Sequence, residues 1–285
     1  MQARTLVVAA LAAAAIAAPT GALAARPKPA TPAVPGAVPL PADALKRLRS
    51  GDPDQIKSAL DDVRTSARAG APAAPVVAEL LARGLPPVLT QAAIDTLGDT
   101  EAEAGSEALA VYAHHRNVAL RRAAVQALAR TKGAPAVRAL RAALSDPDPG
   151  VRGLAATGLG NMKAKETVSD LFVALEHKVN EAAASIGQLC AGSECERLAG
   201  KLGGVPFDVV TSGLDQVLFR PATDVSDDVK VKIVGRVREL GTGEANRFLR
   251  AVQDKWPKAW SARVKQSIDQ AVLATSGSPG TGSAP

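Results

Sequence analysis

Aromatic residues are scarce in this chain of 285 residues, since Phe, Trp and Tyr together make up 2% of it. A core with so few large rings has to be packed by Ala, Leu and Val, and such small side chains let helices approach one another closely. Histidine is also rare, with only His114, His115 and His177. With so few imidazole side chains, a histidine-based metal site or acid–base catalytic site is not expected.

Motifs of catalysis are missing as well. No glycine-rich phosphate loop opens a helix after a strand, and no Gly-x-Ser-x-Gly sequence marks a nucleophile at a sharp turn. We therefore expect a protein that is not an enzyme and that uses no cofactor, no metal and no small-molecule substrate.

The chain has two cysteines, Cys190 and Cys195. On one continuous helix, residues five apart lie on different faces and too far apart to bond, so a bond requires a turn, which Gly192 and Ser193 can supply. In an exported chain such a pair is best interpreted as a local disulfide. The alternative, a metal site with His177 as a third ligand, matches no common zinc spacing.

One long apolar run occurs, from Leu6 to Ala18. It follows Arg4 and precedes Ala22-Leu23-Ala24, an order typical of an export signal with a small-residue cleavage site. The run is shorter than the ~20 residues of a membrane span, so an uncleaved anchor is the less favoured alternative. We expect a signal peptide at 1–24 and a periplasmic or secreted mature chain without a transmembrane segment.

Proline dominates the next segment, residues 25–41, which holds six prolines and predicts an extended or disordered tether. Residues 275–285 are rich in Ser, Gly, Thr and Pro and predict a disordered tail. The intervening residues, 42–274, are numerous enough for a continuous core of stacked units.

A repeat fills this central part. Leu97, Leu128 and Leu159 recur at an interval of 31 residues. Three neighbouring columns keep the same interval: Ala93, Ala124 and Ala155; Leu109, Leu140 and Leu171; Ser106, Val137 and Val168. Each unit has two apolar-periodic segments separated by a polar turn, which predicts a helix hairpin that buries its apolar side against the next hairpin.

The clearest unit is 146–176. Asp148 is a good N-cap residue, and Pro149 suits the first turn of a helix. We expect Gly160 to end this first helix in a left-handed conformation and a second helix to begin near Lys165.

The sequence Asp-Pro-Asp-Pro-Gly-Val-Arg-Gly-Leu-Ala-Ala-Thr-Gly-Leu-Gly at 146–160 resembles the HEAT repeat, particularly the short HEAT-like form first associated with bilin lyases. The match is close at 146–176, good at 117–145 and fair at 87–116. The resemblance implies an all-α fold, a right-handed α-α superhelix (α-solenoid) of HEAT-like helix pairs, and usually a protein-binding role. It does not imply bilin chemistry. Glu176-His177 is reversed and unrepeated, unlike the paired His-Glu motifs of HEAT-repeat di-iron hydroxylases.

Two segments depart from the repeat. Gly203-Gly204-Val205-Pro206 breaks the rhythm, so we predict that a helix at about 206–219 is an insertion outside the repeat. A capping helix is predicted at about 256–273, with Trp256 and Trp260 four residues apart on one face. Covering the exposed end of the stack is the expected role of the two rings, and a ligand-stacking platform is the alternative.

Positive charge is concentrated in one block. From Ala108 to Ser145 there is no acidic residue, whereas seven Lys or Arg residues occur. Arg138 and Arg141 are three apart on a predicted second helix, and in HEAT-like stacks second helices line the concave face. Together with Arg122 they form the predicted contact site, because guanidinium groups suit carboxylate and phosphate groups.

The block also has a structural interpretation. Arg121 and Arg152 occupy equivalent columns, and in HEAT-like units that Arg usually braces the stack by bonding an Asp of an adjacent turn. Asp146 and Asp148 are the structural acidic residues predicted here. The acidic cluster from Asp95 to Glu107 can pair with the basic block between neighbouring units, and a solvated basic face without a ligand is the alternative to a binding site.

The basic residues outnumber the acidic ones by 6, which favours acidic partners modestly. We expect an exported, non-catalytic scaffold that binds another envelope protein or an anionic surface polymer through its concave face. The alternative is a purely structural or assembly scaffold with no dedicated groove. A nucleic-acid-binding HEAT-like protein, which an export signal disfavours, and an enzyme are more remote.

Overall fold

The computed structural model describes residues 38–276. The predicted signal peptide, most of the predicted tether and nearly all of the predicted tail lie outside the described residues. Within residues 38–276 the secondary structure is helical, apart from one isolated bridge between Leu202 and Val205.

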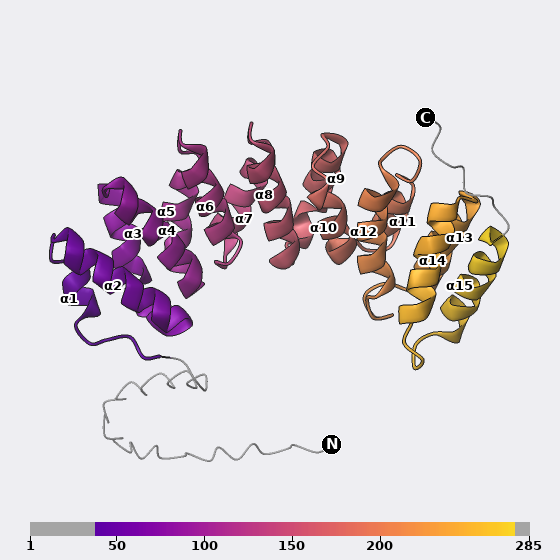
Figure 1. Cartoon of the computed structure of the whole chain (residues 1–285), viewed down its shortest axis with the longest axis horizontal. Coiled ribbons are helices and arrows are strands. Elements are labelled where there is room, and N and C mark those ends of the chain that lie inside the picture. Colours follow the sequence, from indigo (N-terminus) through magenta and orange to yellow (C-terminus); the bar gives the residue numbers. More distant parts are fainter. Residues whose placement is uncertain (1–37, 277–285) are drawn as a thin grey trace, which may run out of the picture. The chain divides into compact units, whose positions relative to one another are not determined.

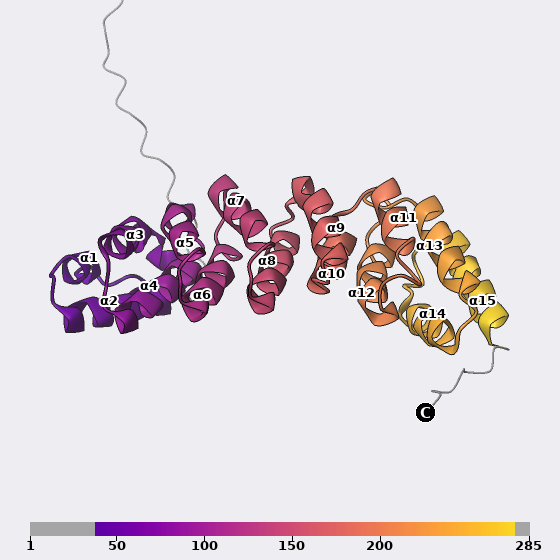
Figure 2. The same ribbon diagram turned by 90° about the horizontal axis from the view of Figure 1, so that it is seen from above.

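The helices form two layers (Figure 1, Figure 2). One layer contains α2 (Pro53–Ser66), α4 (Pro87–Thr100), α6 (Val118–Leu128), α8 (Pro149–Asn161), α10 (Glu181–Leu189), α12 (Phe207–Leu218) and α14 (Gly243–Lys255). The other contains α1 (Ala44–Leu48), α3 (Ala74–Arg83), α5 (Ser106–Tyr112), α7 (Ala134–Ala143), α9 (Val168–Glu176), α11 (Ser193–Ala199), α13 (Asp227–Glu239) and α15 (Ala262–Thr275). Short 3-10 helices lie at η1 (Ala67–Ala73), η2 (Glu103–Gly105) and η3 (Lys165–Thr167).

Contacts between successive even-numbered helices run without a break from α2 to α14, and each of these helices also packs on odd-numbered neighbours. Figure 2 shows the odd-numbered helices α1 to α13 along one side and the even-numbered helices along the other. Helix pairs stacked in chain order on their neighbours define an α-solenoid, which confirms the predicted fold class.

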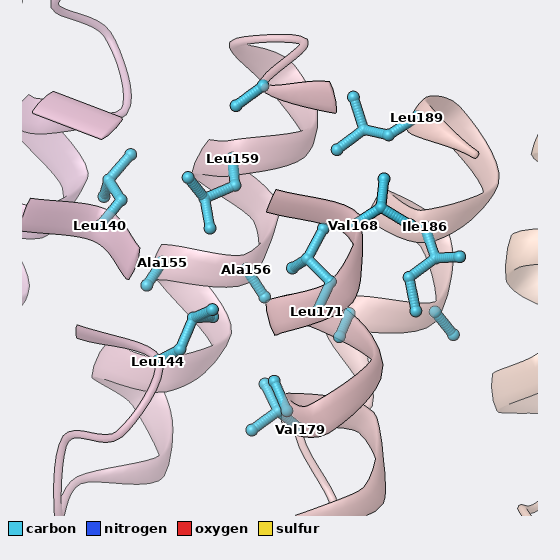
Figure 3. Close-up of a cluster of buried hydrophobic side chains, with 14 of the residues drawn as sticks. Leu140, Leu144, Ala155, Ala156, Leu159, Val168, Leu171, Val179, Ile186 and Leu189 are labelled. Carbon is cyan, nitrogen blue, oxygen red and sulfur yellow. The ribbon is translucent and has the colours of Figure 1, made fainter. Parts of the chain in front are cut away.

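The apolar columns form the core. Leu97, Leu128 and Leu159 are fully buried, as are the members of the Ala93 and Leu109 columns. Figure 3 shows how Leu159 lies between Leu140 of the preceding unit and the following second helix with Leu171. Burial of each such Leu contributes ~1.5–3 kcal/mol, so the 31-residue period is the spacing at which the units share one core.

The first helix of the clearest unit begins as predicted. The carboxylate of Asp148 accepts a hydrogen bond from the amide of Val151 at 2.9 Å, and Pro149 occupies the first turn. The predicted end is wrong, because α8 continues to Asn161 and the left-handed residue is Lys163, with φ of 57°. A Cβ on Gly160 would lie 2.6 Å from Oγ of Ser185 on α10, so Gly160 serves close packing instead.

Helix α12 is not an insertion outside the repeat, which corrects the prediction for 206–219. It packs on α10 and continues the even-numbered layer. The contact is close, because a Cβ on Gly187 would lie 2.1 Å from the carbonyl oxygen of Gly213 and a Cβ on Gly213 would lie 2.2 Å from that of Ala183. Only glycine lets the two backbones meet at this point.

The capping helix predicted at 256–273 begins late, because α15 starts at Ala262. Trp256 has extended backbone angles, as the following Pro257 favours. The two tryptophans therefore lie in the α14–α15 turn rather than on a helix face, with ring centroids 5.4 Å apart, and both rings contact Phe219.

Lys230 completes this aromatic cluster. Its side chain is buried, its Nζ donates to the carbonyl of Arg220, and the ammonium group lies 4.9 Å from the ring centre of Trp260. Burial lowers the pKa of Lys230 below its usual value. The cluster thus joins α13 to the loop after α12 and to the α14–α15 turn.

Cys190 and Cys195 form a disulfide with their Cα atoms 5.3 Å apart. Helix α10 ends at Leu189 and α11 begins at Ser193, so the turn that the sequence requires between the cysteines is present. This confirms the predicted pairing.

Replacing Gly187 with Ala should destabilise the stack by about 2 kcal/mol or more, because the new methyl group meets backbone rather than a movable side chain. The matched control is Gly235→Ala on α13, where a Cβ meets nothing within 4 Å. That variant should gain up to about 1 kcal/mol, because Ala favours a helix over Gly. Urea unfolding followed by circular dichroism measures both, and equal shifts in the two variants would refute the close α10–α12 contact.

Protein purified from an oxidising compartment and denatured without reductant should show no titratable thiol, because its only two cysteines are bonded to each other. The control is the same sample after reduction, which should release two thiols per chain. Two thiols before reduction would contradict the disulfide.

Candidate binding surface

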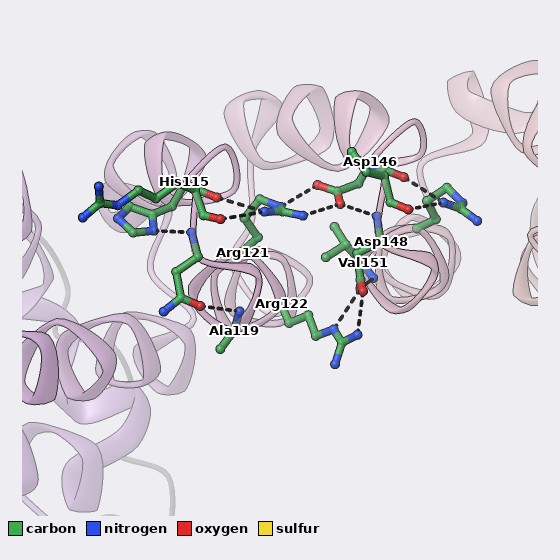
Figure 4. A network of polar contacts seen from close by, with 11 residues as sticks. His115, Ala119, Arg121, Arg122, Asp146, Asp148 and Val151 are labelled. Atoms are coloured by element: carbon green, nitrogen blue, oxygen red, sulfur yellow. Dashed lines mark hydrogen bonds and ion pairs between the residues drawn. The ribbon is translucent and has the colours of Figure 1, made fainter.

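Arg121 links two successive turns of the stack (Figure 4). Its Nε and Nη2 donate to the carboxylate of Asp146 at 2.8 and 2.9 Å, and its Nη1 donates to the carbonyl of His115 at 3.1 Å. His115 precedes α6, whereas Asp146 precedes α8. Hydrogen bonding to Asp146 also raises the pKa of Arg121. Because its hydrogen bonds reach both turns, the guanidinium group braces two neighbouring units.

Arg152 repeats half of this arrangement. Its Nη1 donates to the carbonyls of Asp146 at 2.8 Å and of Pro147 at 3.0 Å. The position that corresponds to Asp146 one unit later is His177, so no carboxylate stands there for Arg152. Arg121 therefore bonds to the next unit, as predicted for both arginines. Arg152 bonds only to the turn that precedes its own helix.

Arg122, one of the three predicted binding residues, forms a two-pronged pair with Asp148, at 2.8 and 2.7 Å. The pair connects α6 to the beginning of α8, where Asp148 also caps the helix through Val151. The pKa of Asp148 is lowered to about 2, chiefly by hydrogen bonding to Arg122 and also by the hydrogen bond from the Val151 amide.

The other two predicted binding residues lie on α7 and point to different neighbours. Arg138 pairs with Glu107 of α5 at 3.2 Å, and Arg141 pairs with Asp170 of α9 at 3.0 Å. Both members of the Arg138–Glu107 pair are exposed, at 65% and 74% of their side-chain area. Arg122 lies in the other layer, so the structure does not bring the three arginines together.

Similar pairs continue along the odd-numbered layer. They join Glu176 to Lys201, Glu196 to Lys232, and Asp228 to Arg263. In the even-numbered layer, Asp99 pairs with both Arg64 and Arg130. An exposed pair contributes 0–1 kcal/mol, so these contacts align neighbouring units more than they stabilise them, and they neutralise much of the basic block.

Two grooves lie along the turns that connect the helices of a pair. The first, of about 520 Å³, lies between the α6–α7 and α8–α9 turns, and the second, of about 450 Å³, lies between the α8–α9 turn and the ends of α10 and α12. Asn161 and Lys163 line both grooves. The two grooves therefore adjoin. They run over three units along the edge of the stack that is formed by the turns within the helix pairs, and together we call them the turn-edge groove.

The grooves carry an excess of positive charge. Their cationic lining residues are Arg130, Lys132, Lys163, Lys165 and Arg220, against Glu166 and Asp224. Asp99 holds Arg130, and Arg220 donates to backbone carbonyls. The three lysines are exposed, and within residues 38–276 no carboxylate forms an ion pair with any of them. They remain available to an anionic ligand.

These lysines were not selected as binding residues from the sequence. A signal was present, because Lys132 and Lys163 are 31 residues apart and so occupy the same place in successive turns. Arg141 of α7 lies one helical turn beyond Val137, which lines the first groove.

Two further properties concern the same part of the chain. Within residues 38–276, no helix has the length and apolar content to cross a bilayer. In that range, no group of three or more His, Cys, Asp or Glu side chains is arranged to hold a metal ion.

No protein-family model matches the chain, and no curated protein matches it either. Among solved structures, the complex of CpcE and CpcF of phycocyanin lyase from Nostoc sp. PCC7120 is similar at 19% identity and a TM-score of 0.43, over 86% of this chain and 98% of that one. One engineered protein is similar at 16% identity and a TM-score of 0.39, over 84% and 97% of the two chains. Another is similar at 15% identity and a TM-score of 0.46, over 83% and 68%.

Replacing Asp148 with Asn should make the protein less sensitive to acid. The folded-state pKa of Asp148, about 2, lies below its usual value of 3.8, so this carboxylate stabilises the fold above pH 4 and loses that effect as the pH falls towards 2. Asn keeps the helix cap but has no charge to lose. The urea midpoint should therefore fall less between pH 5 and pH 2 in the variant than in the wild type.

Arg122→Met is the matched control, because it removes the main cause of the lowered pKa while leaving the carboxylate in place. It should also reduce the acid sensitivity, and the double variant should add little to either single one. Parallel pH profiles for wild type and Asp148→Asn would show that the pair does not shift the pKa.

Proposed function

We propose that this protein is an exported, non-catalytic α-solenoid scaffold that binds an anionic partner, either an acidic envelope protein or an anionic surface polymer. The observation that carries the proposal is the row of exposed lysines, Lys132, Lys163 and Lys165, along two adjoining grooves without carboxylate partners in the described part of the chain. A groove over several units is the kind of extended docking surface that stacked repeats provide.

The turn-edge groove is a better docking surface than the α7 arginines. A partner at Arg138 or Arg141 has to displace Glu107 or Asp170 from an existing ion pair. At Lys132 and Lys163, no carboxylate of residues 38–276 forms an ion pair that a partner has to displace. The difference favours the groove, whose lining includes neither Arg138 nor Arg141.

Export is supported by the sequence at 1–24 and by the Cys190–Cys195 disulfide, since such bonds persist in oxidising compartments. Export also disfavours nucleic acid as the partner. A purely structural scaffold is the second candidate, and the ion pairs between successive units are the observation that favours it.

Crosslinking in intact cells, followed by identification of the captured partners, tests the proposal. A Lys132→Glu/Lys163→Glu variant should lose its partners, because two attractive charges become repulsive. An Arg138→Glu/Arg141→Glu variant is matched in number and kind of charge change and should retain them. Both variants should be checked for wild-type helicity by circular dichroism.

If the Arg138→Glu/Arg141→Glu variant loses its partners and the Lys132→Glu/Lys163→Glu variant retains them, the contact lies on the face formed by the second helices, as the sequence predicts. Retention of the same partners by both folded variants would favour the structural scaffold. Stoichiometric metal in the purified protein would reopen an enzymatic function.

A further inference from the structure

We propose that the ligand of the turn-edge groove is an extended peptide segment with acidic side chains three residues apart, which pair with Lys132 and Lys163. This inference rests on the proposed function and specifies the partner's chemistry. Its first basis is distance. The two lysines occupy equivalent places in neighbouring units, and packed helices lie ~8–10 Å apart. A chain in the extended polyproline II conformation advances ~3.1 Å per residue with three residues per turn, so side chains three residues apart lie on one face and cover about the same step.

The groove lining suits a peptide better than a charged polymer. Asn161, Gln188 and Gln216 line the second groove, and a side-chain amide can both donate to and accept from a peptide backbone. Val137 and Met162 line the first groove and offer apolar contact to side chains that stand between the acidic ones. A polyphosphate has neither amide donors nor apolar side chains for these groups, and a sugar polymer, whose hydroxyl groups can bond the amides, has no apolar side chains for Val137 and Met162.

The backbone conformation of Lys163 determines which substitution can test the inference. Lys163 has φ of 57°, its amide donates to Gly160, and the amide of Ala164 donates to Leu159. This is the Schellman arrangement, in which the left-handed residue is usually Gly because a Cβ is strained there. Lys178 has the same conformation outside both grooves, so this conformation is not by itself a sign of ligand binding.

Neither residues 1–37 nor residues 277–285 can supply the acidic segment. The residues outside the described range, 1–37 and 277–285, contain no Asp or Glu. They therefore cannot supply spaced carboxylates to this groove.

A Lys163→Gly variant tests the inference without a risk to the fold, because Gly adopts the left-handed conformation without strain. The matched control is Lys178→Gly. Lys178 has φ of 64° and ends α9 with the same pair of hydrogen bonds, from its own amide to Leu175 and from Val179 to Ala174. It lies beyond the opposite end of α9 from Lys163. Both variants should unfold at or above the wild-type urea midpoint.

Binding is measured by fluorescence anisotropy with a short peptide that has Glu at every third position. The comparison peptide has the same composition with its Glu residues adjacent. The spaced peptide should bind wild type and Lys178→Gly equally and should bind Lys163→Gly about tenfold more weakly, as expected for the loss of one charged contact. It should also bind the wild type more tightly than the comparison peptide, and the difference between the two protein variants should shrink at high salt.

Equal affinity of the two protein variants for the spaced peptide would overturn the inference. So would equal affinity for the two peptides combined with equally tight, Lys163-dependent binding of inorganic polyphosphate, which would identify a general anion surface. If neither peptide binds while crosslinked partners still depend on Lys132 and Lys163, the peptide inference fails and the proposed function stands. If crosslinking is also independent of these lysines, both fail.

Discussion

Close approach of the even-numbered helices is the constraint on which the rest of the structure depends. A Cβ on Gly98 of α4 would lie 2.9 Å from that of Ala127 on α6, and one on Gly158 of α8 would lie 2.8 Å from that of Ala129, just after α6. Small residues thus stand at these contacts, and at the α10–α12 contact both residues are glycines. The short separation brings the turns of neighbouring units within reach of single side chains.

This proximity determines the electrostatics. Because adjacent turns are close, an arginine of one unit can reach the next unit, as Arg121 does to Asp146 and Arg122 to Asp148. Several charges of the helix faces are paired between units, whereas within residues 38–276 Lys132, Lys163 and Lys165, in the turns that follow α6 and α8, form no ion pair. Positive charge is therefore present along this edge of the stack, where Lys132 and Lys163 repeat with the period of the core.

The core could be predicted from the sequence because its columns repeat, and the Leu97, Leu128 and Leu159 positions are all fully buried. Helix α12 was misjudged because it packs through Gly213, which has no side chain to give an apolar signal. The turn at Trp256 was misjudged because helical spacing to Trp260 was given more weight than the proline between them. The ion pairs of Arg122, Arg138 and Arg141 could not be predicted, because their carboxylate partners lie 26 to 31 positions away in the sequence.

A ligand along the turn edge also affects the stack itself. In a solenoid each unit contacts only its neighbours, so separation of two units is opposed by one interface at a time. A segment that binds Lys132 and Lys163 together adds a contact across the interface of α6 and α7 with α8 and α9. Whatever binds the folded stack and not the separated units stabilises the stack by mass action. The binding proposed at this edge would therefore also make the central units more rigid, through the same contacts.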